Sequence, residues 1–366
     1  MIKLLKKFKL LVIIPSIISL VFIIISIIPT NYDLTVPATL DDIDNSYDFE
    51  GIDTKDVNVS SVSVYSFYNI SVLNYLQALV NPYKVLEKHN KYVNTSLEYA
   101  ASSGTIQKKV ALDNSLIAGY RAASVELNAK FKGYIVHSVF GLEESLIKLG
   151  DIITKCEGVE LTDTLTISDV LAKKYGLYEK NGLYYVKIEA GKSYNFTVKR
   201  GNETIDLSVV AFNYETEDDV FPSLGFNFYE KYDVYSRGSE IEYKINEPDS
   251  FGPSAGLMQA LFIYDALTGE NLTKDLHIVG TGTIDCDGNA GSIGGVKAKI
   301  MAAILDKADV FFVPVEIDEN GEIIKTEGSN YYDALKAYEE LGKPESLAFV
   351  PVAKFSDAVE YLESLK

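Results

Sequence analysis

The stretch that decides the fold is Asp249-Ser250-Phe251-Gly252-Pro253-Ser254-Ala255-Gly256-Leu257-Met258. Its Gly-Pro pair interrupts regular structure, and the residues after Ser254 are apolar at helical spacing up to Gly269. We therefore expect a helix from Ala255 to Thr268, with Ser254 at or just before its first turn. The free N–H groups and the positive dipole at such a helix start can stabilise an oxyanion. Ser254 is therefore a candidate nucleophile.

A serine nucleophile needs a base to take its proton, and histidine is the usual one. The chain has three histidines, His89, His137 and His277. His277 lies on an expected strand from Leu276 to Thr283 and is the histidine alternative as base, although it also suits a surface position of that strand. The sequence favours a lysine instead.

A second glycine-rich segment, Ser292-Ile293-Gly294-Gly295-Val296-Lys297, leads into an expected helix over 296–305. On that helix Lys297 shares a face with isoleucine and methionine at i+3, i+4 and i+7, whereas Lys299 shares its face with two alanines and an aspartate. We expect Lys297 in apolar surroundings, where lost hydration lowers its pKa from about 10.4. A neutral lysine can act as a general base. Taken alone, each half also fits a plain turn or a solvated helix residue, but together they predict Ser254 as nucleophile and Lys297 as base.

The sequence contains three motifs in this order: Gly252-Pro253-Ser254-Ala255-Gly256, Gly280-Thr281-Gly282-Thr283-Ile284, and Ile293-Gly294-Gly295-Val296-Lys297-Ala298-Lys299 followed by Met301-Ala302-Ala303. Their order and spacing resemble the protease domain of the Lon family of Ser/Lys proteases. That resemblance implies Ser254 as the nucleophile and Lys297 as the base, with Thr281 helping to orient the lysine. The chain departs from the commoner pattern at Phe251, where many Lon proteases carry Asp, and at Thr283, where many carry Glu.

No G-x-x-x-x-G-K-[ST] segment occurs in the sequence, so we expect no ATP dependence. No metal and no cofactor is expected either. The resemblance implies a serine endopeptidase that cleaves peptides or proteins through an acyl-enzyme. The alternative is a catalytically inactive, membrane-tethered protein that binds peptides.

The first residues suggest a membrane anchor. Lys3, Lys6, Lys7 and Lys9 precede an uncharged, apolar run from Leu10 to Ile28. At about 1.5 Å per residue a helix of this length spans roughly 28 Å, close to a hydrocarbon core of about 30 Å. The lysines favour a cytoplasmic N-terminus and an extracellular catalytic domain. The alternative is a cleaved signal peptide, but no small-residue cleavage pattern follows the run.

The 366 residues carry a net charge of −18, which argues against nucleic-acid binding. The two cysteines, Cys156 and Cys286, form no metal-ligand pattern and no expected disulfide. We expect an α/β fold of the Lon protease type with an inserted β-rich unit. The expected parts are the lysine-rich start and anchor (1–29), a spacer (30–54), the N-terminal part of the protease domain (55–130), a PDZ-like domain (131–212) and the catalytic domain (213–366). The oligomeric state does not follow from the sequence.

The segment Leu149-Gly150-Asp151-Ile152-Ile153 and the turn at Gly158 resemble a PDZ domain. Such domains bind an extended peptide by adding a strand to a sheet edge. Here the resemblance implies a unit that assists substrate binding. A purely structural role is the alternative.

Overall fold

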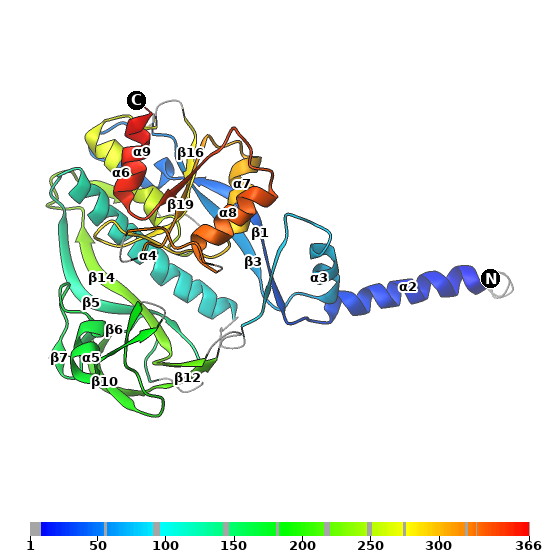
Figure 1. The fold of residues 1–366 in the computed structure, drawn as a ribbon, viewed down its shortest axis with the longest axis horizontal. Coiled ribbons are helices and arrows are strands. Elements are labelled where there is room, and N and C mark those ends of the chain that lie inside the picture. The colour runs from blue at the N-terminus through cyan, green and yellow to red at the C-terminus, as the bar shows by residue number, and fades with distance from the viewer. Residues whose placement is uncertain are drawn as a thin grey trace.

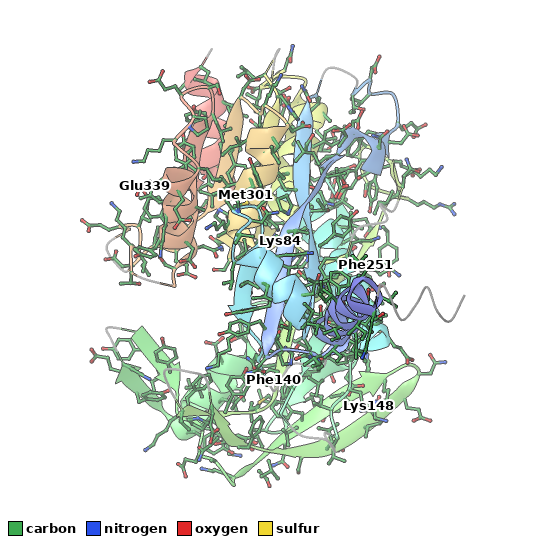
Figure 2. All side chains as sticks on the ribbon, turned by 90° about the vertical axis from the view of Figure 1, so that its right-hand side faces the viewer. Lys84, Phe140, Lys148, Phe251, Met301 and Glu339 are labelled. Atoms are coloured by element: carbon green, nitrogen blue, oxygen red, sulfur yellow. The ribbon has the colours of Figure 1, made fainter. Side chains whose placement is uncertain are left out.

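The structure is a computed structural model that describes residues 9–54, 57–90, 96–141, 146–180, 183–215, 220–246, 251–273, 276–318, 321–326 and 328–365. The predicted lysine cluster before residue 9 and the first two residues of the deciding stretch, Asp249 and Ser250, lie outside these residues. The body of the molecule has an α/β part and a β-rich part (Figure 1). Figure 2 shows them one above the other, with Met301 in the upper part and Lys148 in the lower.

The α/β part is built on a six-stranded mixed sheet. In spatial order its strands are β20 (Ala348–Val352), β19 (Val310–Pro314), β16 (Ile278–Gly280), β3 (Val59–Phe67), β1 (Tyr32–Asp42) and β4 (Val85–Lys88). The first four are parallel, and β1 is antiparallel to both of its neighbours. Because side chains alternate along a strand, Phe312 enters one apolar core and Phe311 the other. Both rings are fully buried, so the sheet is covered on both faces.

Helices form these two covers (Figure 1). One core joins the sheet to α4 (Leu97–Ala122), α6 (Gly256–Thr268) and α9 (Phe355–Ser364). The other joins it to α7 (Val296–Leu305) and α8 (Asn330–Glu340). Shorter elements complete this part: η1 (Asp44–Ser46), β2 (Tyr47–Phe49), α3 (Val72–Ala78), β15 (Tyr243–Ile245), β17 (Thr283–Ile284) and β18 (Ala290–Gly291). The mixed α/β class expected from the sequence is confirmed.

The β-rich part has a sheet and a core of its own. Its main strands, in spatial order, are β11 (Glu203–Val210), β10 (Ser193–Arg200), β6 (Ile152–Cys156), β5 (Asn128–Val139) and β14 (Phe226–Tyr235), with β7 (Val159–Glu160) paired to β6. The helix α5 (Ile167–Tyr175) and the hairpins β8 (Leu177–Lys180)–β9 (Leu183–Val186) and β12 (Phe212–Glu215)–β13 (Val220–Ser223) complete it. Because β14 pairs with β5 along its whole length, this sheet continues beyond the predicted boundary at residue 212. Cys156 and Cys286 are both free and buried.

The predicted spacer over 30–54 is wrong. Residues 32–42 form β1, which pairs with β3 on one side and β4 on the other. Leu34 is 5 % exposed and packs in a small apolar cluster with Ile70 and Ala78. The alternation of apolar and polar residues is interrupted by a register shift between Pro37 and Leu40, which hides the strand in the sequence. Residues 30–54 are therefore part of the folded α/β unit.

The helix α2 (Lys9–Ile27) extends away from the body of the molecule (Figure 1). It contains Pro15, and apolar side chains such as Leu11, Phe22 and Ile27 are exposed along it. Within the part of the chain that the structure describes, no helix combines the length and the apolar character needed to cross a membrane. The predicted transmembrane helix is not confirmed.

Candidate active site

Ser254 lies at the start of α6, one residue before its N-cap Ala255, as the sequence predicts. The start of the helix sits tightly against β17, because a Cβ on Gly256 would come within 2.9 Å of the Ile284 side chain. The Ser254 carbonyl accepts hydrogen bonds from the Gly282 N–H at 2.8 Å and from the Thr281 hydroxyl at 3.1 Å. The segment after β16 therefore holds the backbone of Ser254 in place.

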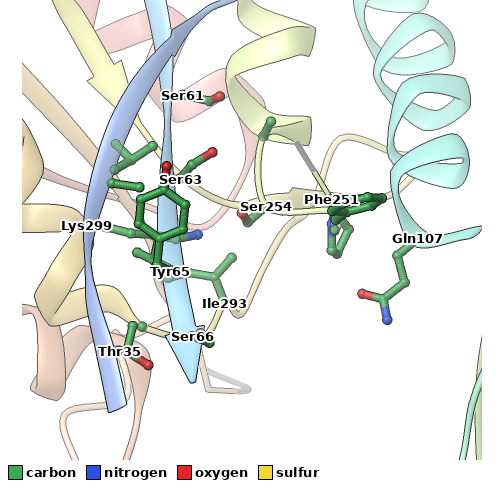
Figure 3. Close-up of a pocket in the computed structure, with 18 of the residues that line it drawn as sticks. Thr35, Ser61, Ser63, Tyr65, Ser66, Gln107, Phe251, Ser254, Ile293 and Lys299 are labelled. Carbon is green, nitrogen blue, oxygen red and sulfur yellow. The ribbon is translucent and has the colours of Figure 1, made fainter. Parts of the chain in front are cut away.

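Lys299 is the buried lysine of α7. It is 3 % exposed, and burial lowers its pKa to about 7 because the charged form loses hydration. No carboxylate of the described residues forms an ion pair with it, so no opposite charge offsets that loss of hydration. Figure 3 shows the side chain running from α7 with its nitrogen turned toward Ser254. A large fraction of Lys299 is therefore neutral near pH 7.

Thr281 connects this lysine to the serine. Its side chain is fully buried, and its hydroxyl accepts a hydrogen bond from Lys299 Nζ at 2.9 Å. The same hydroxyl donates its proton to the Ser254 carbonyl. Since a threonine hydroxyl has a single proton, Lys299 must be the donor in the first bond. A neutral Lys299 that donates in this way keeps its lone pair for another proton.

The prediction that Lys297 is the apolar lysine is wrong. Its side chain is 34 % exposed and forms an ion pair with Glu340 of α8. The face comparison failed because α7 is buried almost all round, including the alanines beside Lys299. Alanine marks where the helix packs closest to the sheet, not where it meets solvent.

Ser254 and Lys299 line one cavity of about 950 Å³ (Figure 3). Strands β1 and β3 provide one wall, which includes Thr35, Ser63 and Tyr65, and the segment 292–295 provides another. Lys299 is the only lysine among the described residues that line it, and Lys297 is absent from that lining.

The backbone around Ser254 offers hydrogen-bond donors. At the helix start, the Gly256 N–H donates to the Pro253 carbonyl and the Leu257 N–H to the Gly282 carbonyl. Among the described residues no acceptor takes the N–H of Ser254 or of Ala255. These two groups, rather than the deeper amides of the helix, are available to an oxyanion.

Both departures from the expected motif lie at this cavity. Phe251 is 64 % exposed and contacts Gly104 of α4, where a Cβ would come within 3.0 Å of it. The Gly252 N–H donates to the Gly104 carbonyl, so the turn before Ser254 is held by α4. Thr283 packs against Gly291, whose Cβ would come within 2.2 Å of its hydroxyl. Neither residue supplies a carboxylate near Lys299.

His277, the alternative base, is not part of this site. Its ring lies near Asp306 and Ser60, and it does not line the cavity that holds Ser254. Within the described residues no group of His, Cys, Asp and Glu side chains is arranged to hold a metal ion.

Residues 244–334 match the family model of the Lon protease (S16) C-terminal proteolytic domain. The matched range includes Ser254, Thr281 and Lys299. It supports a Lon-like serine peptidase, and it covers neither the β-rich part nor residues 1–243.

Proposed function

We propose that this protein is a serine endopeptidase in which Ser254 is the nucleophile and Lys299 the general base. The observation that carries the proposal is a buried lysine, with a pKa lowered to about 7, that shares a cavity with a serine at a helix start. The match to the Lon proteolytic domain supports the reaction class. Lys299 thus replaces Lys297, the base expected from the sequence.

The first chemical step is acyl transfer to Ser254. Neutral Lys299 accepts the hydroxyl proton while Ser254 Oγ bonds to the carbonyl carbon of the substrate. The N–H groups of Ser254 and Ala255 stabilise the negative oxygen that forms. The protonated lysine then gives its proton to the leaving amine, and the C–N bond breaks. Water, deprotonated by the same lysine, hydrolyses the ester and restores Ser254.

Thr281 acts as a positioning residue in this scheme. Its hydrogen bond with Lys299 and its hydrogen bond with the Ser254 carbonyl fix the position of the amine relative to the serine backbone. Because the threonine occupies one N–H of the amine, the lone pair is free to take the serine proton. This is the role that the sequence resemblance implies for Thr281, transferred to Lys299.

The test is cleavage of casein and of a mixed peptide library by the full chain, read by mass spectrometry, with and without ATP. We expect cleavage that is unaffected by ATP and is lost in folded Ser254→Ala. Wild-type protein that cleaves neither substrate, or Ser254→Ala that cleaves as fast as wild type, would exclude the proposal. The first result would favour the alternative, an inactive protein that binds peptides.

The β-rich part supports a substrate-binding role in this proposal. It has its own buried core, and α5 packs in that core against the sheet. A PDZ-like mode of peptide capture stays a prediction, as does the purely structural alternative. Binding of peptides to the full chain with residues 193–210 altered would separate the two roles.

The proposed location, an extracellular catalytic domain on a membrane anchor, also stays a prediction from residues 1–28. The exposed apolar side chains of α2 are the feature that bears on it. Fractionation of cells that make the full chain tests it: the proposal requires the protein in the membrane pellet after a carbonate wash. Protein in the supernatant would exclude it.

A further inference from the structure

A second cavity, of about 400 Å³, lies beside the proposed active site. It is lined from both parts of the molecule, by Tyr134, Thr166 and Phe228 of the β-rich part and by Ile284 and Gly291 of the α/β part. Tyr229, Pro253 and Thr283 line this cavity and the active-site cavity alike. Since Pro253 is the residue before Ser254, a peptide held at the serine has a path for one of its side chains into the second cavity.

The charged side chains among the described residues that line this cavity are both carboxylates, Glu230 and Asp285. Glu230 of β14 is half-buried, and burial together with the nearby Asp287 and Asp285 raises its carboxyl pKa. The Cys286 thiol donates to one of its oxygens at 3.2 Å. Among the described residues, no lysine, arginine or histidine lines the cavity, and none of these cations pairs with Glu230. A positive charge placed there would meet an uncompensated carboxylate.

Asn114 of α4 forms part of the wall. It is 6 % exposed, and its amide nitrogen donates to the Ile284 carbonyl at 3.0 Å. The amide oxygen receives no hydrogen bond from any described residue. The bond to the Ile284 carbonyl ties α4 to β17 in this wall, and the amide oxygen is itself shielded from the cavity.

Aromatic rings form the apolar walls. Tyr134 is 2 % exposed and packs edge-on against Phe228, with ring centroids 5.5 Å apart. Tyr229 stacks on the buried ring of His137, with centroids 4.1 Å apart. Burial lowers the pKa of His137 to about 4, so this stack is neutral near pH 7. Such walls suit the methylene stem of a long side chain, and aromatic faces attract a cation at its end.

We propose that the second cavity is a specificity pocket that takes a Lys or Arg side chain of the substrate next to the scissile bond. Glu230 pairs with the cationic end, and the aromatic walls hold the stem. The proposal rests on the proposed peptidase function, because it assigns the substrate class of that same site. It predicts a preference that neither the family match nor the sequence motifs specify.

The test measures binding and cleavage with the full chain. Peptides that contain one lysine are compared with the same peptides carrying norleucine, which keeps the stem and removes the charge. We expect wild type to cleave the lysine peptides with kcat/KM higher by about tenfold or more, the size of one charge-assisted hydrogen bond. Glu230→Gln keeps the side-chain size and an acceptor for Cys286, and it should bring the ratio close to one.

Asp163→Asn is the matched control. Asp163 is an exposed carboxylate near Tyr134 that does not line the cavity. It should leave the lysine preference unchanged. An equal loss of the lysine preference in Asp163→Asn and Glu230→Gln would assign the effect to the overall negative charge of the protein. That result would overturn the proposal that the second cavity is a specificity pocket.

Binding of the same peptides to Ser254→Ala separates this proposal from the peptidase function. If wild type cleaves nothing but Ser254→Ala binds lysine peptides more tightly, and Glu230→Gln removes that difference, the pocket stands and the peptidase function fails. If wild type cleaves lysine and norleucine peptides equally, the peptidase function stands and the pocket fails.

Discussion

At the scale of the residue, the proposed activity depends on which of the two lysines of α7 is buried. Lys297 and Lys299 are two positions apart, yet one forms an ion pair at the surface and the other is 3 % exposed. Desolvation alone accounts for the lowered pKa of Lys299. The same burial that makes this lysine costly to ionise makes it a base near neutral pH.

The pKa of Lys299 predicts how the rate of peptide cleavage depends on pH. The base must be neutral, so kcat/KM should rise as the pH increases through about 7 and level off by about pH 9. Initial rates between pH 5.5 and 9.5 at constant ionic strength check this, with circular dichroism at each pH to show that the protein stays folded. A rate that is flat from pH 6 to 9 would contradict an amine base.

The nucleophile could be predicted from the sequence, but the base could not. The Gly-Pro-Ser turn fixes Ser254 at a helix start by local geometry. The choice between the two lysines depends on how closely α7 packs against the sheet, and composition marks that packing only through the small residues Ala302 and Ala303. Reading alanine as a packing residue would have pointed to Lys299. The backbone N–H groups of Ser254 and Ala255, which no described residue accepts, could be identified as free donors only from the backbone geometry.

At the scale of the element, close contact between α6 and β16 holds the site together. A Cβ on Gly280 would lie 2.4 Å from Met258 Sδ and 3.0 Å from the Phe312 side chain. The residues that follow Gly280 bind the Ser254 carbonyl. Glycine at this position therefore allows the helix that starts beside the nucleophile to pack on the strand that leads to Thr281.

Gly280→Ala should destabilise the protein by about 1–3 kcal/mol, because the added methyl group overpacks a fully buried contact. It should also lower the cleavage rate, since relief of the clash moves Thr281. Urea unfolding followed by fluorescence measures the first effect. Gly294→Ala is the control for stability, because nothing lies within 4 Å of its added Cβ and its φ is not positive. Equal unfolding midpoints for the two variants would disprove the packing argument.

At the scale of the whole molecule, most of the α/β part follows from sequence patterns. The helices α6 and α7 lie within one residue of their predicted bounds. Strand β1 was missed because Pro37 and acidic residues gave its segment the composition of a spacer. This strand forms through long-range pairing with β3 and β4, and local composition does not predict such pairing.

Two truncations test the place of β1. Deletion of residues 1–30 removes α2 and keeps β1, so we expect a folded protein with peptide cleavage close to that of the full chain. Deletion of residues 1–54 removes β1, leaves β3 with an unpaired edge and opens the wall of the active-site cavity that Thr35 helps to form. We expect that protein to be insoluble or unfolded. A stable, active protein lacking residues 1–54 would contradict the role of β1 and restore the prediction that residues 30–54 are a spacer.

The most direct test of the account is the cleavage rate of two matched variants, Lys299→Met and Lys297→Met. Methionine keeps an unbranched apolar side chain at either position, and unfolding curves show whether each variant is folded. The account predicts that Lys299→Met lowers kcat by about 10² to 10⁴-fold, the usual effect of losing a general base. It predicts that Lys297→Met, which loses only a surface ion pair with Glu340, stays within about twofold of wild type. Loss of cleavage in folded Lys297→Met with activity retained in Lys299→Met would contradict the account.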